Sequence, residues 1–169
     1  MQTHTRSGFT LIELLLYVGI TSIILFAISL FFSILLQSRI KSDTVTDVEQ
    51  QGTQAMLVMT QAIRNADAVN APLPGASASS LSLTTSSTGP SPTVFSLSGG
   101  ALTLTQGAAA PIALTNNRVT VSALRFTNLA RPGTPDIVRI SFALTAVNAT
   151  GRTEYRYTQT FLGSAQRRP

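Results

Sequence analysis

The sequence predicts an α+β fold in which one long N-terminal helix, apolar in its first half, packs on an antiparallel β-sheet. Four observations lead to this prediction. The chain has no proline before Pro72, and it carries no charged residue from Leu14 to Ser38. Apolar residues then recur at spacings of three or four up to Val69, which is the period of an amphipathic helix. From Thr93 onward the period changes to two, which is typical of half-buried strands.

The uncharged run is long enough to cross a membrane as a helix. Its 25 residues from Leu14 to Ser38 would extend over more than the roughly 30 Å of a hydrocarbon core at about 1.5 Å per residue. A cleaved secretory signal fits less well, because its apolar region spans only about 7–15 residues and ends at a small-residue cleavage site. The run here ends instead in the letters SILLQSRIKS. A plain single-pass anchor stays open at this point.

One glutamate interrupts this apolar segment near its start. Glu13 is the only acidic residue before Asp43. A carboxylate inside a bilayer costs up to about 2.5–3.5 kcal/mol on insertion scales, so an intramembrane charge indicates a functional role with a specific partner. The simpler alternative is that Glu13 reaches the headgroup region from the end of the helix.

The residues around Glu13 resemble a known processing signal. Arg6-Ser7-Gly8-Phe9-Thr10-Leu11-Ile12-Glu13-Leu14 is similar to the signal of type IV prepilins and pseudopilins, in which a short basic leader ends in glycine before an aromatic residue and an apolar helix. The resemblance implies that residues 1–8 are a leader peptide. It also implies that a prepilin peptidase cuts between Gly8 and Phe9 and that the new N-terminal Phe9 is methylated.

The same resemblance gives Glu13 a partner and the protein a role in assembly. It implies that Glu13 faces the N-terminal amine of Phe9 in a neighbouring subunit, so that two buried charges neutralise each other and set the register of docking. The implied partners are the prepilin peptidase, other pilin or pseudopilin subunits, a platform membrane protein and an assembly ATPase. The implied location is the cytoplasmic (inner) membrane as a single-pass protein, and then an extracellular or periplasmic filament.

The helix is expected to have two halves, residues 9–38 for the membrane and assembly and residues 39–70 for packing on the globular part. The second half carries one stripe of apolar or small residues at Val48, Ala55, Met59, Ala62, Ile63, Ala66 and Val69. Residues 71–92 are rich in Ser, Ala, Thr and Pro and predict a loop with at most one short strand at residues 81–83.

Residues 93–169 are expected to form the antiparallel β-sheet domain. The letters TVFSL and ALTLT flank Ser98-Gly99-Gly100 as a hairpin, and RVTVSALRF alternates next. DIVRISFAL pairs with EYRYTQTFL around a turn at residues 148–151. The faces predicted to be half-buried are Val138, Ile140, Phe142 and Leu144 on one strand, and Tyr155, Tyr157, Gln159 and Phe161 on the other. The sequon at residues 148–150 is interpreted as part of the turn.

The composition argues against enzymatic chemistry, cofactors and metals. The chain has no cysteine, and its only histidine, His4, lies in the expected leader, which excludes disulfides, the usual zinc sites and histidine-dependent triads. Beyond the helix the acidic residues are singletons, and Gly99-Gly100 lacks the context of a phosphate-binding loop. We therefore expect a structural protein that is not an enzyme.

Two finer questions stay open from the sequence. The segment Met59–Ala66 and the strand-rich half resemble the larger minor pilins and pseudopilins of the J and W type, which favours a minor pilin or pseudopilin. The alternatives are a DNA-binding competence pilin and a membrane-anchored β-domain that never polymerises. The net charge of +5 is interpreted as a solvated basic surface, so DNA is not the favoured partner. The residues that would bind it are Arg118, Arg125, Arg131, Arg139, Arg152, Arg156, Arg167 and Arg168.

Overall fold

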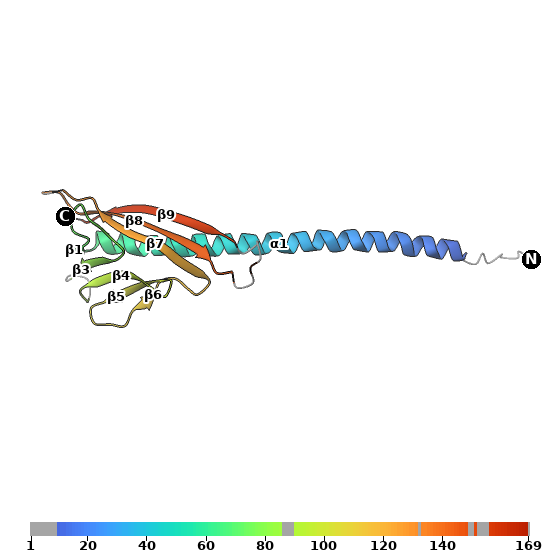
Figure 1. The fold of residues 1–169 in the computed structure, drawn as a ribbon, viewed down its shortest axis with the longest axis horizontal. Coiled ribbons are helices and arrows are strands. Elements are labelled where there is room, and N and C mark those ends of the chain that lie inside the picture. Colours follow the sequence, from blue (N-terminus) through green and yellow to red (C-terminus); the bar gives the residue numbers. More distant parts are fainter. Residues whose placement is uncertain (1–9, 86–89, 132, 149–150, 152–155, 169) are drawn as a thin grey trace, which may run out of the picture. The chain divides into compact units, whose positions relative to one another are not determined.

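The computed structural model describes residues 10–85, 90–131, 133–148, 151 and 156–168. The chain forms two compact units, Met1–Ile40 and Lys41–Pro169. One helix, α1 (Leu11–Arg64), passes through both units (Figure 1). The described part is therefore α+β, as the sequence predicted.

Helix α1 ends earlier than the sequence predicted. We expected its amphipathic half to extend to Asn70, but the helix ends at Arg64. Beyond it the backbone of Asp67 donates to the carbonyl of Thr84 at 2.8 Å, and Ala68 begins a strand that pairs with the same segment. Asn65 and Asp67 are poor helix formers, so pairing with a neighbouring strand replaces the last predicted turns.

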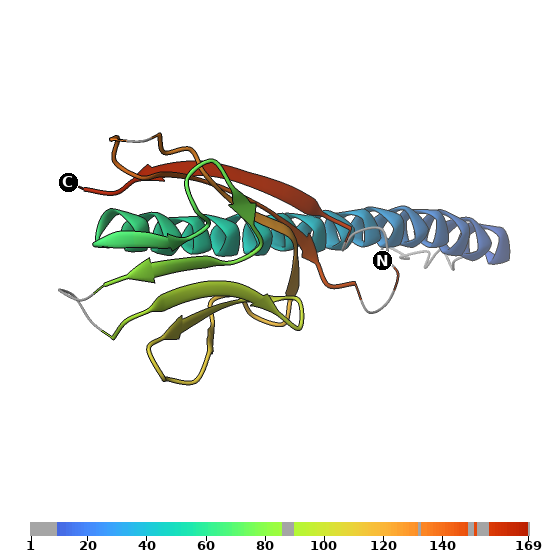
Figure 2. The ribbon, with the colours of Figure 1, turned by 60° about the vertical axis from the view of Figure 1, so that its left-hand side comes forward.

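The strands of the second unit form two antiparallel sheets instead of the single sheet expected. Their bounds are β1 (Ala68–Ala71), β2 (Ser77–Ala78), β3 (Leu81–Thr84), β4 (Thr93–Ser98), β5 (Ala101–Gln106), β6 (Ile112–Ala113), β7 (Val119–Asn128), β8 (Ile137–Ala146) and β9 (Thr158–Gln166). The five-stranded sheet has the order β1-β3-β4-β5-β6, and the four-stranded sheet has the order β2-β7-β8-β9. Figure 2 shows the two sheets beside the last turns of α1. The predicted loop at residues 71–92 thus contributes two strands, one to each sheet.

The predicted hairpin between β4 and β5 is present. Its turn is Gly99-Gly100, with φ values of 57° and 80°. Two consecutive positive φ angles are what a two-residue type I′ turn requires, and glycine adopts them without steric cost. The turn chemistry in the sequence was therefore sufficient to predict this element.

Strand β7 departs from simple alternation at one residue. The pairing with β8 shifts between Ser122 and Arg125, and Ala123 has a φ of 52°. This bulge inserts one extra residue. Val121 before it and Leu124 after it are consequently both buried. In a regular strand, residues three positions apart would point to opposite faces. Arg125 is turned to the exposed face as a result.

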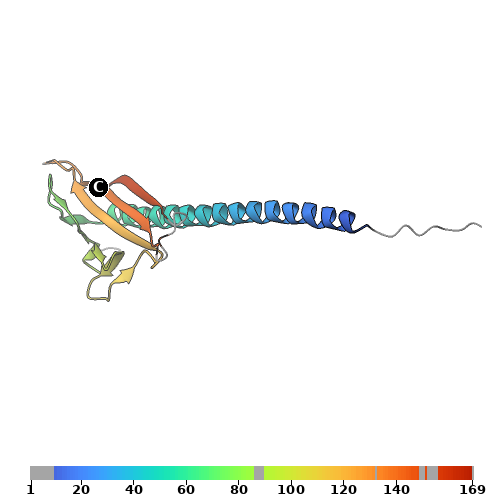
Figure 3. The same ribbon diagram turned by 45° about the vertical axis from the view of Figure 1, so that its right-hand side comes forward.

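Strands β8 and β9 pair in the order that the sequence predicted. Phe142 lies opposite Phe161, and Leu144 lies opposite Gln159. Figure 3 shows β7, β8 and β9 side by side along the second half of α1. The described strand β9 begins at Thr158; Tyr155 and most of the predicted turn lie outside the described residues.

The core of the second unit lies where the stripe of α1 meets the sheets. Val48, Ala55, Met59 and Ile63 are almost fully buried, as predicted, and Gly52 lies on the same face. A Cβ added to Gly52 would overlap the Phe161 ring. That ring in turn stacks on Phe142 with a centroid distance of 5.2 Å and an interplanar angle of 17°. A glycine in the helix therefore lets β9 approach it closely.

Candidate assembly site

The first unit presents a long, exposed apolar surface. From Leu11 to Leu36 its large hydrophobic side chains are between 45% and 79% exposed. Within the described residues, α1 is the one helix long and apolar enough to cross a membrane, by length and composition. Burying each such side chain away from water is worth about 1.5–3 kcal/mol, so this surface favours either lipid or other helices.

The hydroxyl side chains of this segment bond to the backbone of the same helix. Thr21 donates to the carbonyl of Tyr17 at 2.7 Å, and Ser22 donates to that of Val18 at 2.8 Å. Ser33 donates to the carbonyl of Leu30 at 2.9 Å. These bonds satisfy groups that would otherwise lose hydrogen bonds to water in an apolar environment. The polar residues within the apolar run are therefore compatible with insertion into a bilayer.

Thr10 and Glu13 form the start of α1. The Oγ1 atom of Thr10 accepts from the backbone N–H of Glu13 at 3.4 Å, and the Thr10 carbonyl accepts from the N–H of Leu14 at 3.2 Å. Thr10 is therefore the N-cap, and Glu13 occupies the third helical position. A carboxylate in the first turn also interacts favourably with the positive end of the helix dipole.

Of the three site residues predicted from the sequence, the structure describes one, Glu13. Gly8 and Phe9 lie outside the described residues. Glu13 is half-buried in the first turn of α1, and it is the one acidic residue of that turn. The sequence reasoning missed Thr10 as the N-cap, although the spacing Thr-x-x-Glu at the start of an apolar run is a known sign of a helix N-terminus.

Several polar contacts join the stretch of α1 that follows Lys41 to the rest of the second unit, and two of them involve carboxylates. Arg118 Nη1 lies 2.8 Å from Asp47 Oδ2, and the Tyr157 hydroxyl donates to Glu49 Oε1 at 3.4 Å. Partial burial, followed by the negative charge of Glu49, raises the pKa of Tyr157 above its ordinary value. The Arg118 pair is substantially exposed, so it fixes geometry more than it adds stability.

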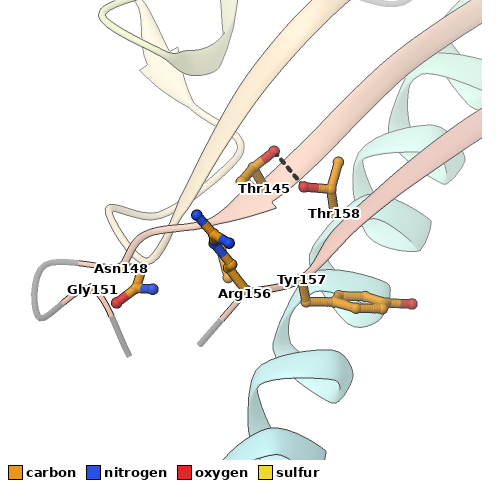
Figure 4. A pocket seen from close by; sticks show the side chains of 7 residues that line it. Thr145, Asn148, Gly151, Arg156, Tyr157 and Thr158 are labelled. Atoms are coloured by element: carbon orange, nitrogen blue, oxygen red, sulfur yellow. Dashed lines mark hydrogen bonds between the residues drawn. The ribbon is translucent and has the colours of Figure 1, made fainter. Parts of the chain in front are cut away.

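A pocket of about 590 Å³ lies beside the end of β8 and the start of β9. Figure 4 shows Arg156 and Asn148 among the side chains that line it, with the Thr145 and Thr158 hydroxyls hydrogen-bonded at 3.0 Å. The residues between Gly151 and Arg156 lie outside the described part. Within the part of the chain that the structure describes, no three His, Cys, Asp or Glu residues gather as metal ligands would.

The fold and this site define a class of protein, an α+β domain joined to a single N-terminal apolar helix that is consistent with membrane anchoring. A family model gives a more specific assignment for the N-terminus: the prokaryotic N-terminal methylation motif matches residues 3–29. The chain thus carries the type IV pilin and pseudopilin signal. The motif implies processing by a prepilin peptidase and assembly with other pilin subunits, and it is typical of structural proteins and not of enzymes. No curated protein and no solved structure gave a significant match to the chain.

Proposed function

We propose that this chain is a structural subunit of a type IV pilus-like filament or of a type II secretion pseudopilus. The observation that carries the proposal is the methylation motif at residues 3–29, which leads directly into an exposed apolar helix with one carboxylate in its first turn. In this proposal the prepilin peptidase cuts between Gly8 and Phe9, and Phe9 is methylated. The platform membrane protein and the ATPase then move the subunit from the membrane into the filament.

Glu13 sets the register of docking in this mechanism. Cleavage gives Phe9 a positive amine at the N-terminal end of α1. The carboxylate of Glu13 in one subunit lies against this amine in its neighbour, and each charge removes the cost of burying the other. Breaking a buried ion pair by removing one partner typically costs about 3–5 kcal/mol. A subunit docked out of register would leave one of the two charges buried without its partner. The free-energy cost of that unpaired charge favours the register in which Glu13 meets the amine.

The apolar surface of α1 supplies cohesion after the subunit leaves the lipid. Within the bilayer the side chains between Leu11 and Leu36 gain little by exchanging lipid for protein, because both surroundings are apolar. Outside the bilayer the same side chains would face water unless the helices bundle. The hydrophobic effect therefore holds the filament together where the membrane no longer does.

Among filament subunits, a minor pilin or pseudopilin of the J or W type is the assignment we favour. It is supported by the resemblance of Met59–Ala66 and of the strand-rich half, and by the presence of Glu13.

The test of the register mechanism is the substitution Glu13→Gln in cells that contain the assembly machinery. We expect normal cleavage after Gly8 but a severe loss of the protein from sheared filaments, because the amine of Phe9 has no carboxylate to meet. The matched control is Glu49→Gln, which removes an equal charge from the exposed surface of the second unit and should leave assembly intact.

Both outcomes are informative about the mechanism. Loss of assembly in Glu13→Gln together with normal assembly in Glu49→Gln supports the register role. Normal incorporation of the Glu13→Gln protein would show that this carboxylate is not needed for docking.

A further inference from the structure

The described edge strands of the two sheets are protected to different degrees against pairing with another strand. The strand orders make β1, β6, β2 and β9 the edge strands. Strands β2 and β6 have two residues each, and Pro111 directly precedes β6. Strand β1 has four residues, contains a register shift and is directly followed by Pro72. Short length, bulges and proline all discourage a sheet edge from pairing with another chain.

Strand β9 has none of these protective features. It is nine residues long, and its sequence TQTFLGSAQ contains no charged residue and no proline. It pairs with β8 along its whole length without a register shift. Figure 2 shows β9 at the margin of the four-stranded sheet. A long edge without charge, proline or bulge is a template for a further strand.

The backbone groups of alternate residues in β9 point to the open side of the strand. The carbonyl of Tyr157 accepts from the N–H of Ala146, and the N–H of Arg167 donates to the carbonyl of Asp136. In an antiparallel pair, residues bonded to the partner strand alternate with residues whose N–H and C=O point away from it. The even-numbered residues within 158–166 therefore present these groups outward. The outward groups have no hydrogen-bond partner among the residues that the structure describes.

The side chains along this edge are neutral in the middle and positive beyond both ends. Those that face outward are uncharged and exposed: Thr158, Thr160, Leu162, Ser164 and Gln166. The central one, Leu162, is 72% exposed. Two exposed arginines, Arg156 and Arg168, flank the strand, and neither makes an ion pair with a described residue. By charge complementarity, the edge fits an extended segment with a neutral middle and acidic ends.

A second copy of the chain fits this edge less well. Helix α1 and β9 run in the same direction, because Glu49 lies beside Tyr157 and Met56 lies over Gly163. Antiparallel pairing of two β9 strands would therefore put their Lys41 ends, where each chain continues into its apolar segment, at opposite ends of the joined sheet. That arrangement does not suit two chains anchored in one membrane, and full overlap would bring the flanking arginines of the two copies together. Parallel pairing would turn one sheet over and leave the exposed leucines on opposite faces.

We propose that β9 binds one extended segment of a different polypeptide, which becomes an additional strand of the four-stranded sheet. The segment bonds to the outward backbone groups of residues 158–166 and places an apolar side chain beside Leu162. Its acidic ends meet Arg156 and Arg168. Main-chain hydrogen bonds give such strand addition its affinity, and alternate side chains give it specificity. The interaction adds a partner to the proposed filament subunit and rests on that proposed function only for its biological setting.

The test measures binding of a labelled synthetic peptide to the full-length chain held in a neutral detergent. The peptide has the length of the span from Arg156 to Arg168, with glutamate at both ends and alternating threonine and valine between them. The amides along one of its edges are N-methylated, so that it cannot build extended sheets with itself. We expect saturable binding of this peptide and none of the same peptide N-methylated along both edges. Lysine in place of the two glutamates should weaken binding by about tenfold or more.

Two substitutions of Leu162 test the edge from the side of the protein. Leu162→Lys puts a charge on the open edge, and Leu162→Pro removes one outward donor without breaking the bonds to β8. Each should weaken peptide binding by about tenfold or more, the factor that one net hydrogen bond or one buried apolar side chain represents. The matched control is Leu73→Lys, because Leu73 is 68% exposed and lies outside the strands. It should bind the peptide as wild type does.

A second pair of variants tests the acidic ends of the segment. Arg156→Gln/Arg168→Gln should weaken binding of the glutamate peptide and should leave binding of a peptide with uncharged ends unchanged. Arg125→Gln/Arg131→Gln removes the same charge from exposed positions outside β9 and should have little effect on either peptide. Thermal unfolding of every variant establishes that it is folded.

The proposal is overturned if the wild-type chain does not bind the peptide, if both Leu162 variants bind it as tightly as wild type, or if Leu73→Lys loses as much affinity. A wild-type dimer in detergent that Leu162→Lys converts to a monomer would also overturn it, because the occupant would then be a second copy. Its failure is distinguishable from failure of the proposed function, because cleavage after Gly8 is measured from the mass of the chain and does not depend on β9.

Discussion

At the scale of single residues, Tyr157 and Glu49 connect the last strand pair to the helix. The Tyr157 hydroxyl lies within hydrogen-bond distance of Glu49 Oε1 at 3.4 Å and of Gln159 Oε1 at 3.2 Å. Ionising the phenol would place a negative charge beside the Glu49 carboxylate in a partly buried position. The contact therefore favours the neutral phenol, in agreement with the raised pKa of Tyr157.

This contact predicts a dependence of stability on pH in the alkaline range. Because the pKa of Tyr157 is higher in the folded chain, the stabilisation is fully present below about pH 10 and is lost as pH rises through the raised pKa. Glu49→Gln should bring the pKa of Tyr157 back toward its ordinary value and weaken that loss. Absorbance titration of the tyrosines, compared between wild type and variant, measures the change.

Asp43→Asn is the matched control for this titration, since Asp43 is an exposed carboxylate on α1 six residues before Glu49. It should leave the tyrosine titration unchanged. Identical titration curves for wild type and Glu49→Gln would show that the carboxylate does not act on Tyr157.

At the scale of elements, the close approach of α1 and β9 depends on two glycines. Phe161 of β9 lies over Gly52 of the helix, and Met56 of the helix lies over Gly163 of the strand. Each glycine on one element thus receives a large side chain from the other. This complementary packing places β9 against the helix and completes the core around Phe142.

The packing predicts that Gly52→Ala destabilises the second unit. Alanine would improve helix propensity by about 1 kcal/mol. Its methyl group would, however, displace the Phe161 ring, and overpacking typically costs about 1–3 kcal/mol. The free energy of unfolding should therefore fall, and the thermal unfolding of the full chain in detergent should shift to lower temperature.

Gly19→Ala is the control for this substitution, because no atom of the chain lies within 4 Å of a Cβ at Gly19. It should not lower the unfolding temperature of the second unit. The double variant Gly52→Ala/Phe161→Leu should recover part of the lost stability, since leucine leaves room for the methyl group. A Gly52→Ala protein as stable as wild type would refute the close packing.

The same elements show how far the sequence alone could predict the fold. The period of the stripe from Val48 to Ile63 and the glycine pair at residues 99–100 were local signals, and the structure confirms both elements. The division into two sheets depends on which strands pair over long range, which no local pattern encodes. The bulge at Ala123 leaves a trace in the sequence, because the apolar residues Val121 and Leu124 are three positions apart instead of two. Reading the whole segment as a simple alternation of apolar and polar residues overlooks this one irregular step.

At the scale of the whole molecule, the two units differ in how far their large apolar side chains are exposed to solvent. Among the described residues, the first unit exposes its large apolar side chains, whereas the second unit buries most of its own, fully or in part, between a helix and two sheets. An apolar surface of this kind is stable in lipid or in a bundle of helices. The N-terminal methylation motif matches residues 3–29, which lie within the first unit.

The N-terminal motif could be recognised from the sequence alone because it is short and linear. Gly8, Phe9 and Glu13 belong to a contiguous motif, which a single sequence displays in full. The open edge of β9 is different, because only the order of the strands makes β9 an edge strand. Sequence reasoning predicted the pairing of this strand with the letters DIVRISFAL, but it could not show that the other side of the strand lies open in the part of the chain that the structure describes.

The central claim, that the chain is processed as a pilin-like subunit, is tested most directly by its N-terminus. The measurement is the intact mass and N-terminal sequence of the protein recovered from membranes, with and without a co-expressed prepilin peptidase. The account predicts a peptidase-dependent chain that begins at Phe9 and carries an added methyl group. A chain that begins at Met1 in both samples would contradict it and would leave Glu13 as a charge in a simple membrane anchor.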